Sequence, residues 1–216
     1  MNVVGLNLSF RKAVPVDADT IVAIVNSAYR GESSRKGWTT EADLLTGART
    51  VAAEIIELIN AQGSVILLAE ANASAEVSSN HGSNHRSNHG SNTQDATDIA
   101  TNPSEAPTII GSVHLSKTDD NGECAGYFGM FAINPDLQAG GFGKQMIREA
   151  ELFVQREWNA NKMVMEVIPV RHELIAFYER RGYRLTGKVK PFPVNPELWL
   201  PKAQALQLAR MEKRFG

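Results

Sequence analysis

The chain has a single cysteine, no long apolar run and little net charge. Because Cys124 has no second cysteine to pair with, an intramolecular disulfide is excluded and a reducing cytoplasm is the expected location. No apolar stretch approaches the roughly 20 residues of a transmembrane helix. Residues 1–9 lack the basic start and apolar core of a signal peptide, so none is expected. A formal net charge of −2 predicts no general attraction to nucleic acids or membranes.

The length of 216 residues is enough to bury a hydrophobic core, and we expect one domain over residues 1–216. Residues 72–107 differ in composition from the rest, because they carry a repeated Ser-Asn-His tetrapeptide and few apolar side chains. So few apolar groups cannot offset the cost of ordering the backbone. We therefore expect a disordered insertion between two strands.

Three histidines in this insertion raise the question of a metal site. His81, His85 and His89 are four residues apart, and a helix would align them as ligands. Gly82 and Gly90 disfavour that helix. A solvated insertion is the better interpretation, and no metal is predicted.

Elsewhere, hydrophobic periodicity predicts an alternation of strands and helices. The expected strands are residues 6–13, 65–70, 108–116, 127–133, 162–168, 183–190 and 206–214. The expected helices are residues 15–29, 50–62, 142–158 and 171–181, with a further short helix beginning at Thr40. The evidence for the short helix is a capping-box pattern, in which Asp43 follows Thr40 by three residues. This order predicts an α/β fold class, with a mixed sheet and helices on both faces.

Residues 138–144, Gln-Ala-Gly-Gly-Phe-Gly-Lys, lie between an apolar strand and an amphipathic helix. Glycine lets the backbone approach an anion closely, and the unpaired N–H groups of a first helical turn point toward it. The segment therefore predicts a phosphate site. It is not a P-loop, because Gln145 follows Lys144 and the earlier glycine is missing, and it does not match the dinucleotide-binding fingerprint.

The pattern Q-x-x-G-x-G after a strand ending in Asn-Pro resembles the pyrophosphate loop of the GNAT superfamily of acyl-CoA-dependent N-acyltransferases. Gln138, Gly141 and Gly143 fall on its three fixed positions. The resemblance implies a mixed, mostly antiparallel sheet of about seven strands, whose central strands splay apart to admit the cofactor. It implies a transferase that moves an acetyl group from acetyl-CoA to a small-molecule or peptide amine, by direct attack on the thioester. Many relatives of this fold pair into homodimers.

The resemblance also implies where the cofactor is held. The strand before the loop would pair with the pantetheine amides, and backbone N–H groups of the loop would hold the pyrophosphate. The helix dipole adds roughly 0.3–1 kcal/mol for each favourable charge. The matching residues are Phe131, Ala132 and Ile133 on the strand, and Gln138, Ala139, Gly140, Gly141, Phe142, Gly143 and Lys144 in the loop.

Residues 177–183, Phe-Tyr-Glu-Arg-Arg-Gly-Tyr, resemble the family's stretch in which a helix ends at a glycine before an aromatic-led strand. The position of Tyr178 commonly supplies the general acid. The leaving thiolate has a pKa of about 8.5, and a phenol of pKa about 10 can hydrogen-bond to it or protonate it. Alternatively, Tyr178 only packs against Phe177 and Tyr183. The family often has an asparagine seven residues earlier, where this chain has Arg171, and that contact stays unassigned.

A general base is needed when the attacking amine is strongly basic. Neutralising a lysine-like amine at pH 7 costs about 4.6 kcal/mol, whereas an α-amine costs about 1 kcal/mol. Glu166 interrupts an apolar strand, and because a buried unpaired carboxylate is costly, it should face solvent or the slot between the strands. Glu166 is therefore the candidate base, with Glu123 as the alternative.

Aromatic side chains could line the acceptor side. Tyr29 and Trp38 lie in the early helical region, and Tyr127 stands where some family members carry a carboxylate. Such side chains could equally fill the core. Two other functions stay open: a non-catalytic acyl-CoA-binding module of the same fold, and a nucleotide-binding α/β domain. The position of the loop past the middle of the chain disfavours the second.

Overall fold

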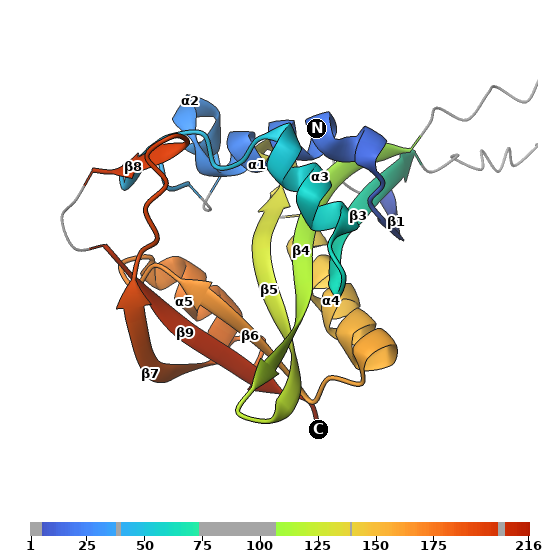
Figure 1. Ribbon diagram of the computed structural model, residues 1–216. Coiled ribbons are helices and arrows are strands. Elements are labelled where there is room, and N and C mark those ends of the chain that lie inside the picture. Colours follow the sequence, from blue (N-terminus) through green and yellow to red (C-terminus); the bar gives the residue numbers. More distant parts are fainter. Residues whose placement is uncertain (1–5, 38–39, 74–106, 139, 203–205) are drawn as a thin grey trace, which may run out of the picture.

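A mixed sheet of seven strands forms the centre of the molecule (Figure 1). The computed structural model describes residues 6–37, 40–73, 107–138, 140–202 and 206–216. In spatial order the strands are β1 (Leu6–Lys12), β3 (Ser64–Ala73), β4 (Thr108–Asp120), β5 (Glu123–Ile133), β6 (Lys162–Val167), β9 (Gln207–Arg214) and β7 (Arg184–Pro191). All neighbouring strands are antiparallel except β5 and β6. The expected sheet is confirmed, while most of the predicted insertion at 72–107 lies outside the described residues.

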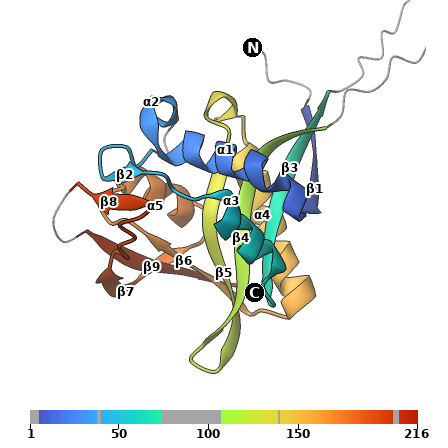
Figure 2. The same ribbon diagram turned by 45° about the horizontal axis from the view of Figure 1, so that its top comes forward.

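Helices cover both faces of the sheet, as Figure 2 shows from a second angle. They are α1 (Ala18–Tyr29), α2 (Gly31–Ser34), α3 (Ala52–Asn60), α4 (Phe142–Trp158) and α5 (His172–Glu179), with 3-10 turns at Pro15–Asp17 and Pro135–Leu137. Helices α4 and α5 share one hydrophobic core with the sheet, and α1 and α3 share a second core on the opposite face. None of the helices in the described ranges is long and apolar enough to cross a membrane.

The apolar spacing of α4 explains how it packs. Met146, Ile147, Ala150 and Val154 recur every three or four residues, so they form one stripe along the helix. Each is at most 2% exposed, in the same core as Val113 of β4. Burying a large apolar side chain contributes about 1.5–3 kcal/mol. This packing holds the start of α4 beside the end of β5.

A second sheet of two strands pairs β2 (Leu45–Gly47) with β8 (Trp199–Pro201). It lies toward α2 and away from the hairpin that joins β4 to β5 (Figure 1). Gly47 has a φ of 80°, and a Cβ there would overlap the carbonyl oxygen of Leu198, so the close approach requires glycine. The N–H of Ala48 donates to the same carbonyl at 2.9 Å. The segment after α2 is thereby tied to the late proline-rich loop.

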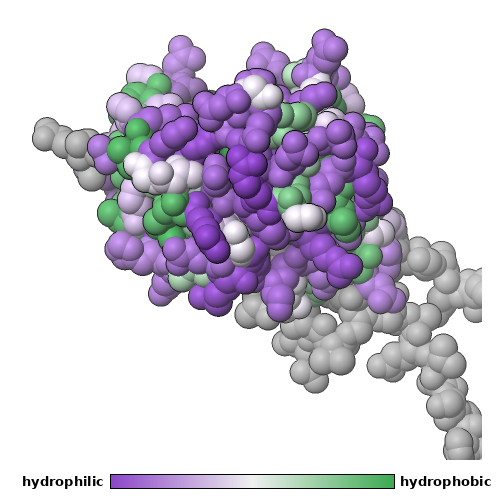
Figure 3. All heavy atoms as spheres, turned by 90° about the horizontal axis from the view of Figure 1, so that it is seen from below, coloured by the Kyte–Doolittle hydropathy of each residue, from purple (hydrophilic) through white to green (hydrophobic). Residues whose placement is uncertain are grey.

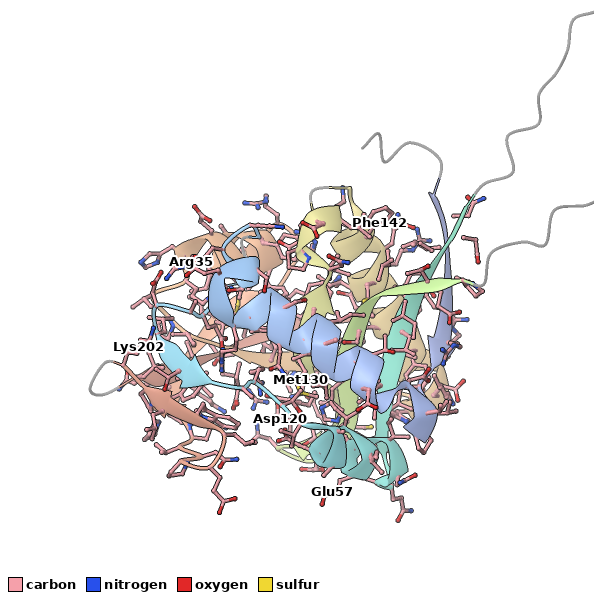
Figure 4. The ribbon with its side chains drawn as sticks, turned by 90° about the horizontal axis from the view of Figure 1, so that it is seen from above. Arg35, Glu57, Asp120, Met130, Phe142 and Lys202 are labelled. Atoms are coloured by element: carbon pink, nitrogen blue, oxygen red, sulfur yellow. The ribbon has the colours of Figure 1, made fainter. Side chains whose placement is uncertain are left out.

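The prediction of a short helix beginning at Thr40 is wrong. The hydroxyl of Thr40 accepts from the N–H of Ala42 at 3.2 Å, and Asp43 is held outside by Arg35, with an Nη2–Oδ1 distance of 2.7 Å. The capping box therefore does not close, and a single turn leads directly into β2. Figure 4 shows Arg35 beside α2, on the side where Lys202 follows β8.

Ion pairs hold the end of the sheet at which β4 and β5 form their hairpin. Lys162 is only 2% exposed, and its Nζ lies 2.6 Å from Asp120 and 2.8 Å from Glu123. Glu123 also pairs with Arg214 at 2.8 Å, and these two cations, Arg214 foremost, lower the pKa of Glu123 to about 2. A carboxylate with so low a pKa is a weak base. Glu123 also lies at the start of β5, whereas the loop follows the end of this strand. The surface seen from below is mostly hydrophilic (Figure 3).

Candidate active site

Strands β5 and β6 separate part-way along their length. Their parallel pairing ends at Phe128 and Met165, although β5 continues to Ile133. Met130 has a φ of 44°, and the pairing of β5 with β4 shifts register at this point. A bulge of this kind adds one residue to a strand and bends it. The bend lies under α1, where Figure 4 labels Met130, and the expected splay of the central strands is confirmed.

A cavity of about 540 Å³ lies between the end of β5, the start of α4 and α5. We call it the loop cavity. It is lined by Phe131, Ile133, Leu137, Gln138, Gly141, Phe142, Gly143, Lys144, Glu173, Ala176, Phe177, Arg180 and Arg181. The glycine-rich segment singled out in the sequence therefore forms one wall of a real cavity.

The start of α4 is built to receive an anion at this wall. Gly141 caps the helix with a φ of 81°. The first hydrogen bond runs from the N–H of Lys144 to the carbonyl of Gly141 at 3.1 Å, so the N–H groups of Phe142 and Gly143 precede the helical ladder. All four residues line the loop cavity. Free N–H groups and the positive end of a helix dipole are the usual phosphate-binding elements.

Gln138 anchors the loop to the strand before it. Its Nε2 donates to the carbonyl of Ile133 at 3.1 Å. A Cβ on Gly37 would come within 2.6 Å of the Gln138 side chain, so the segment after α2 closes over this glutamine. Gln138 thus positions the loop as well as lining the cavity.

A second cavity, of about 190 Å³, lies where β5 and β6 separate, and we call it the inner cavity. Its lining comes from residues 29–49 and 192–199 as well as from β5, β6 and α5. Phe131 lines both cavities, so the two are adjacent at this residue, which we call their junction. On α5, Phe177 lines the loop cavity and the next residue, Tyr178, lines the inner cavity. The candidate acid therefore stands beside the junction.

Tyr178 is 5% exposed and packs among aromatic rings. Its ring centroid lies 5.4 Å from that of Phe177, 5.8 Å from that of Tyr183 and 6.2 Å from that of Phe128. Burial, followed by the nearby phenol of Tyr29, raises the pKa of Tyr178. The phenol is therefore neutral and holds its proton at neutral pH. The packing expected as an alternative is present, and it leaves Tyr178 on the wall of the inner cavity.

Glu166 and Tyr127 lie together in the inner cavity. The Glu166 side chain is 17% exposed, and its Oε1 lies 2.6 Å from the Nζ of Lys190. Burial, and next the negative charge of Glu166, raise the pKa of Tyr127 to about 12. Of the two candidate bases, Glu166 lines the inner cavity and Glu123 does not.

A family match gives this geometry a context. Residues 81–183 match the model of the acetyltransferase (GNAT) family, and the matched stretch includes β5, the glycine-rich loop, α4 and α5. Residues 81–183 therefore belong to a GNAT acetyltransferase domain. This confirms the resemblance and the enzyme class expected from the sequence, an acetyl-CoA-dependent N-acetyltransferase. A comparison with curated protein sequences gives no significant match.

Solved GNAT structures share the fold at low sequence identity. The spermidine N-acetyltransferase of Vibrio cholerae, in complex with CoA and spermine, is 18% identical over 96% of this chain and 95% of that chain, with a TM-score of 0.57. An N-acetyltransferase from Staphylococcus aureus Mu50 is 8% identical over 96% and 97%, with a TM-score of 0.60. A GNAT-family acetyltransferase from Streptococcus pneumoniae is 14% identical over 97% and 100%, with a TM-score of 0.56.

Most of the GNAT contact positions expected from the sequence line the loop cavity. Two do not: the side chain of Ala132 is buried in the core under α1, and Gly140 is exposed beside the loop. Both could contribute only through their backbones. Ala139 and Trp38 lie outside the described residues. The contacts of all these positions with the cofactor or acceptor stay predictions.

Sequence reasoning missed a buried charge cluster in this GNAT chain. The carboxylate of Glu41 lies 2.6 Å from Arg30 and 3.3 Å from Arg171. Arg30 is 7% and Glu41 8% exposed, and all three side chains line the inner cavity. Arg171, which replaces the family's asparagine, therefore contacts Glu41. The partners are 11 and 130 residues apart, so no local pattern could have revealed them.

Metal ligands do not gather in the described part of this GNAT chain. Within the described ranges, no three His, Cys, Asp or Glu side chains are placed to hold an ion together. His81, His85 and His89 lie outside those ranges.

Proposed function

We propose that this GNAT enzyme joins the acetyl group of acetyl-CoA to a primary amine at the junction of its two cavities. The observation that carries the proposal is that Phe131 lines both the loop cavity and the inner cavity. A thioester held through the loop cavity would reach Phe131 from one side, and an amine in the inner cavity would reach it from the other. Transfer between them requires no cysteine nucleophile.

In this proposal, the start of α4 holds the pyrophosphate. The N–H groups of Phe142 and Gly143 supply hydrogen bonds, and the exposed Lys144 adds positive charge at the rim. The end of β5, from Phe131 to Ile133, lies beside the pantetheine, because the splay frees this edge from β6. The volume of about 540 Å³ falls in the usual range for cofactor sites.

Tyr178 stabilises the leaving sulfur. As the C–N bond forms and the C–S bond breaks, negative charge collects on sulfur, and the phenol donates a hydrogen bond to it. Because burial raises the pKa of Tyr178 further above the value of about 8.5 for a thiol, the proton stays largely on the phenol. The thiolate takes its proton from solvent on release. Such assistance typically contributes about 10²–10⁴ in rate.

Glu166 receives the proton that the amine loses. The carboxylate shares the inner cavity with Tyr127, whose raised pKa keeps it protonated as a hydrogen-bond donor. The Nζ of Lys190, at 2.6 Å, holds the carboxylate in place. The polyamine complex of the Vibrio cholerae neighbour supports a primary amine as acceptor in this chain. A cytoplasmic location and a homodimer stay predictions.

The experiment is thiol release from acetyl-CoA across a panel of primary amines, with wild type, Tyr178→Phe and Tyr183→Phe. Tyr183 is a matched control because its hydroxyl donates to Glu151 at 3.0 Å and lines neither cavity. We expect amine-dependent release in wild type, a loss of about 100-fold or more in Tyr178→Phe, and retained turnover in Tyr183→Phe. Tight CoA binding without any amine-dependent thiol release would contradict the proposed acetyltransferase activity. Full turnover in Tyr178→Phe would contradict the proposed role of that tyrosine.

A further inference from the structure

Arg49 stands on the wall of the inner cavity with its backbone held on both sides. Its N–H donates to the Oδ1 of Asn26 at 2.7 Å, and the Nδ2 of Asn26 donates to the carbonyl of Thr50 at 3.1 Å. The preceding N–H, of Ala48, donates to Leu198 at 2.9 Å. The segment therefore presents the Arg49 side chain from a rigid position.

The guanidinium of Arg49 contacts two aromatic rings and, among the residues that the structure describes, no acid. Its Cζ lies 5.8 Å from the centroid of the Tyr29 ring and 5.9 Å from that of Trp199. Within the described part of the chain it makes neither an ion pair nor a side-chain hydrogen bond. Cation–π contacts of this kind orient a guanidinium but leave its N–H edge open for a planar anion.

The two carboxylates of the inner cavity are already matched by other cations. Glu41 forms ion pairs with both Arg30 and Arg171, and Glu166 forms one with Lys190 at 2.6 Å. The cavity lining therefore carries an excess of positive charge, with Arg49 as its unmatched member.

Arg30, which also lines the inner cavity, adds to this excess. It is 7% exposed, and its Nε and Nη2 are buried without a hydrogen-bond partner among the described residues. A buried guanidinium with unmet donors is costly. A negative charge that enters the inner cavity lowers this cost, whereas a second positive charge raises it.

Tyr29 connects the arginine to the proposed reaction centre. Its ring lies under the Arg49 guanidinium, and its hydroxyl donates to the carbonyl of Phe131 at 2.7 Å. Tyr29 therefore contacts both Arg49 and the residue that lines both cavities. A small molecule with groups at both ends can lie along this tyrosine, between Arg49 and Phe131.

We propose that Arg49 binds a carboxylate of the acceptor, so that the substrate of this enzyme is a small primary amine that also carries a carboxylate, as amino acids do. The inference rests on the proposed function and names its acceptor class. The guanidinium fork matches a carboxylate through two parallel hydrogen bonds. A polyamine would bring further positive charge to a wall that already carries an excess, so the acceptor differs from that of the Vibrio cholerae neighbour, which was crystallised with spermine.

The test compares an ω-amino acid with its amide and with the diamine of equal length, in wild type, Arg49→Met, Arg49→Lys and Arg35→Met. Arg35 is the matched control, because it is an exposed arginine that pairs with Asp43 at 2.7 Å and does not line the inner cavity. Thiol release gives kcat/KM for each amine. Calorimetric titration of the same amines into the protein with CoA gives binding without turnover.

We expect wild type and Arg35→Met to prefer the amino acid over its amide by about tenfold or more, in kcat/KM and in Kd. In Arg49→Met this ratio falls toward one, and in Arg49→Lys it lies between the two because charge remains but the fork is lost. Equal use of all three amines, preference for the diamine, or an unchanged ratio in Arg49→Met overturns the inference while leaving acetyl transfer intact. Carboxylate-selective binding with no thiol release from any amine instead overturns the proposed function and leaves the Arg49 site standing. An amine bearing a phosphate in place of the carboxylate, if it bound more tightly than the amino acid, would overturn the choice of carboxylate.

Discussion

The hydroxyl of Tyr29 donates a hydrogen bond of 2.7 Å to the carbonyl of Phe131. This bond ties the end of α1 to β5 at the residue that lines both cavities. The ring of the same tyrosine lies beneath Arg49. One side chain therefore contacts both the strand edge that we propose faces the cofactor and the cation that we propose binds the acceptor.

Gly143→Ala should separate cofactor binding from stability. The added Cβ would lie 3.3 Å from Phe131 and 3.7 Å from Phe177, two side chains that line the loop cavity. Alanine favours a helix by about 1 kcal/mol relative to glycine, so the free energy of unfolding should hold or rise. The Kd for CoA should weaken about tenfold, as measured by calorimetry beside urea unfolding. Unchanged CoA affinity would place the cofactor elsewhere.

Gly141→Ala is the control, because it should change stability without adding a contact in the loop cavity. Gly141 has a φ of 81°, and a Cβ there meets nothing within 4 Å. Left-handed backbone costs a residue with a Cβ about 1–2 kcal/mol. This variant should therefore lose stability without any new side-chain contact in the loop cavity.

Glu166→Gln should slow basic amines more than weakly basic ones. Neutralisation at pH 7 costs about 4.6 kcal/mol for an amine of pKa about 10.4 and about 1 kcal/mol for an α-amine, so a base matters more for the first. We expect kcat/KM to fall about tenfold or more for the basic amine and clearly less for the other. Glu123→Gln, which removes a carboxylate at the far end of β5, is the control. Equal losses for both amines would exclude Glu166 as the base.

Glu41→Gln should destabilise the fold strongly. The change leaves Arg30 and Arg171 buried without a carboxylate, and breaking a buried pair in this way typically costs about 3–5 kcal/mol. For a chain of this size the Tm should fall by about 10 °C. Glu32→Gln, at an exposed pair with Arg35, should change stability by less than about 0.5 kcal/mol. Thermal unfolding of the two variants side by side decides the matter, and equal Tm values would refute the buried cluster.

His114 should make stability depend on pH in mildly acidic solution. Burial, followed by the charge of Arg49, lowers the pKa of His114 to about 4 from its ordinary 6.5. The unfolded chain therefore binds a proton more readily, so stability falls as pH decreases from 6.5 through 4, by about 2 kcal/mol at pH 5. Urea unfolding at pH 7.5 and 5 should show a smaller loss for His114→Gln than for wild type. Parallel losses in the two proteins would refute this role.

The order of elements was predictable because it depends on local patterns. The stripe of α4 and the apolar runs of β5 and β6 are visible at spacings of two to four residues, and the glycine-rich loop lies within residues 138–144. Each of these features is determined by neighbours close in sequence. Their positions in the structure therefore agree with the expectation to within a few residues.

The inner cavity was not predictable, because long-range pairs build it. Arg171 meets Glu41 across 130 residues, and Arg49 meets Trp199 through the pairing of β2 with β8. The same pairing, with the ion pair of Asp43 to Arg35, removed the helix that the capping box favoured. Glu166 was found because a lone carboxylate in an apolar strand is itself a local signal. Tyr29, Tyr127, Phe131 and Tyr178 were named from the family resemblance, and they also line this cavity.

The most direct test of acetyl transfer follows the acetyl group itself. Acetyl-CoA with an isotopically heavy acetyl group is incubated with the enzyme and an amine, and mass spectrometry measures the amine, the released CoA and the intact protein. The account predicts heavy acetyl on the amine nitrogen in amounts equal to the CoA released, with no acetyl on the protein. Release of CoA as free acetate, or acetyl held on the protein before it reaches the amine, would contradict direct transfer at the junction of the two cavities.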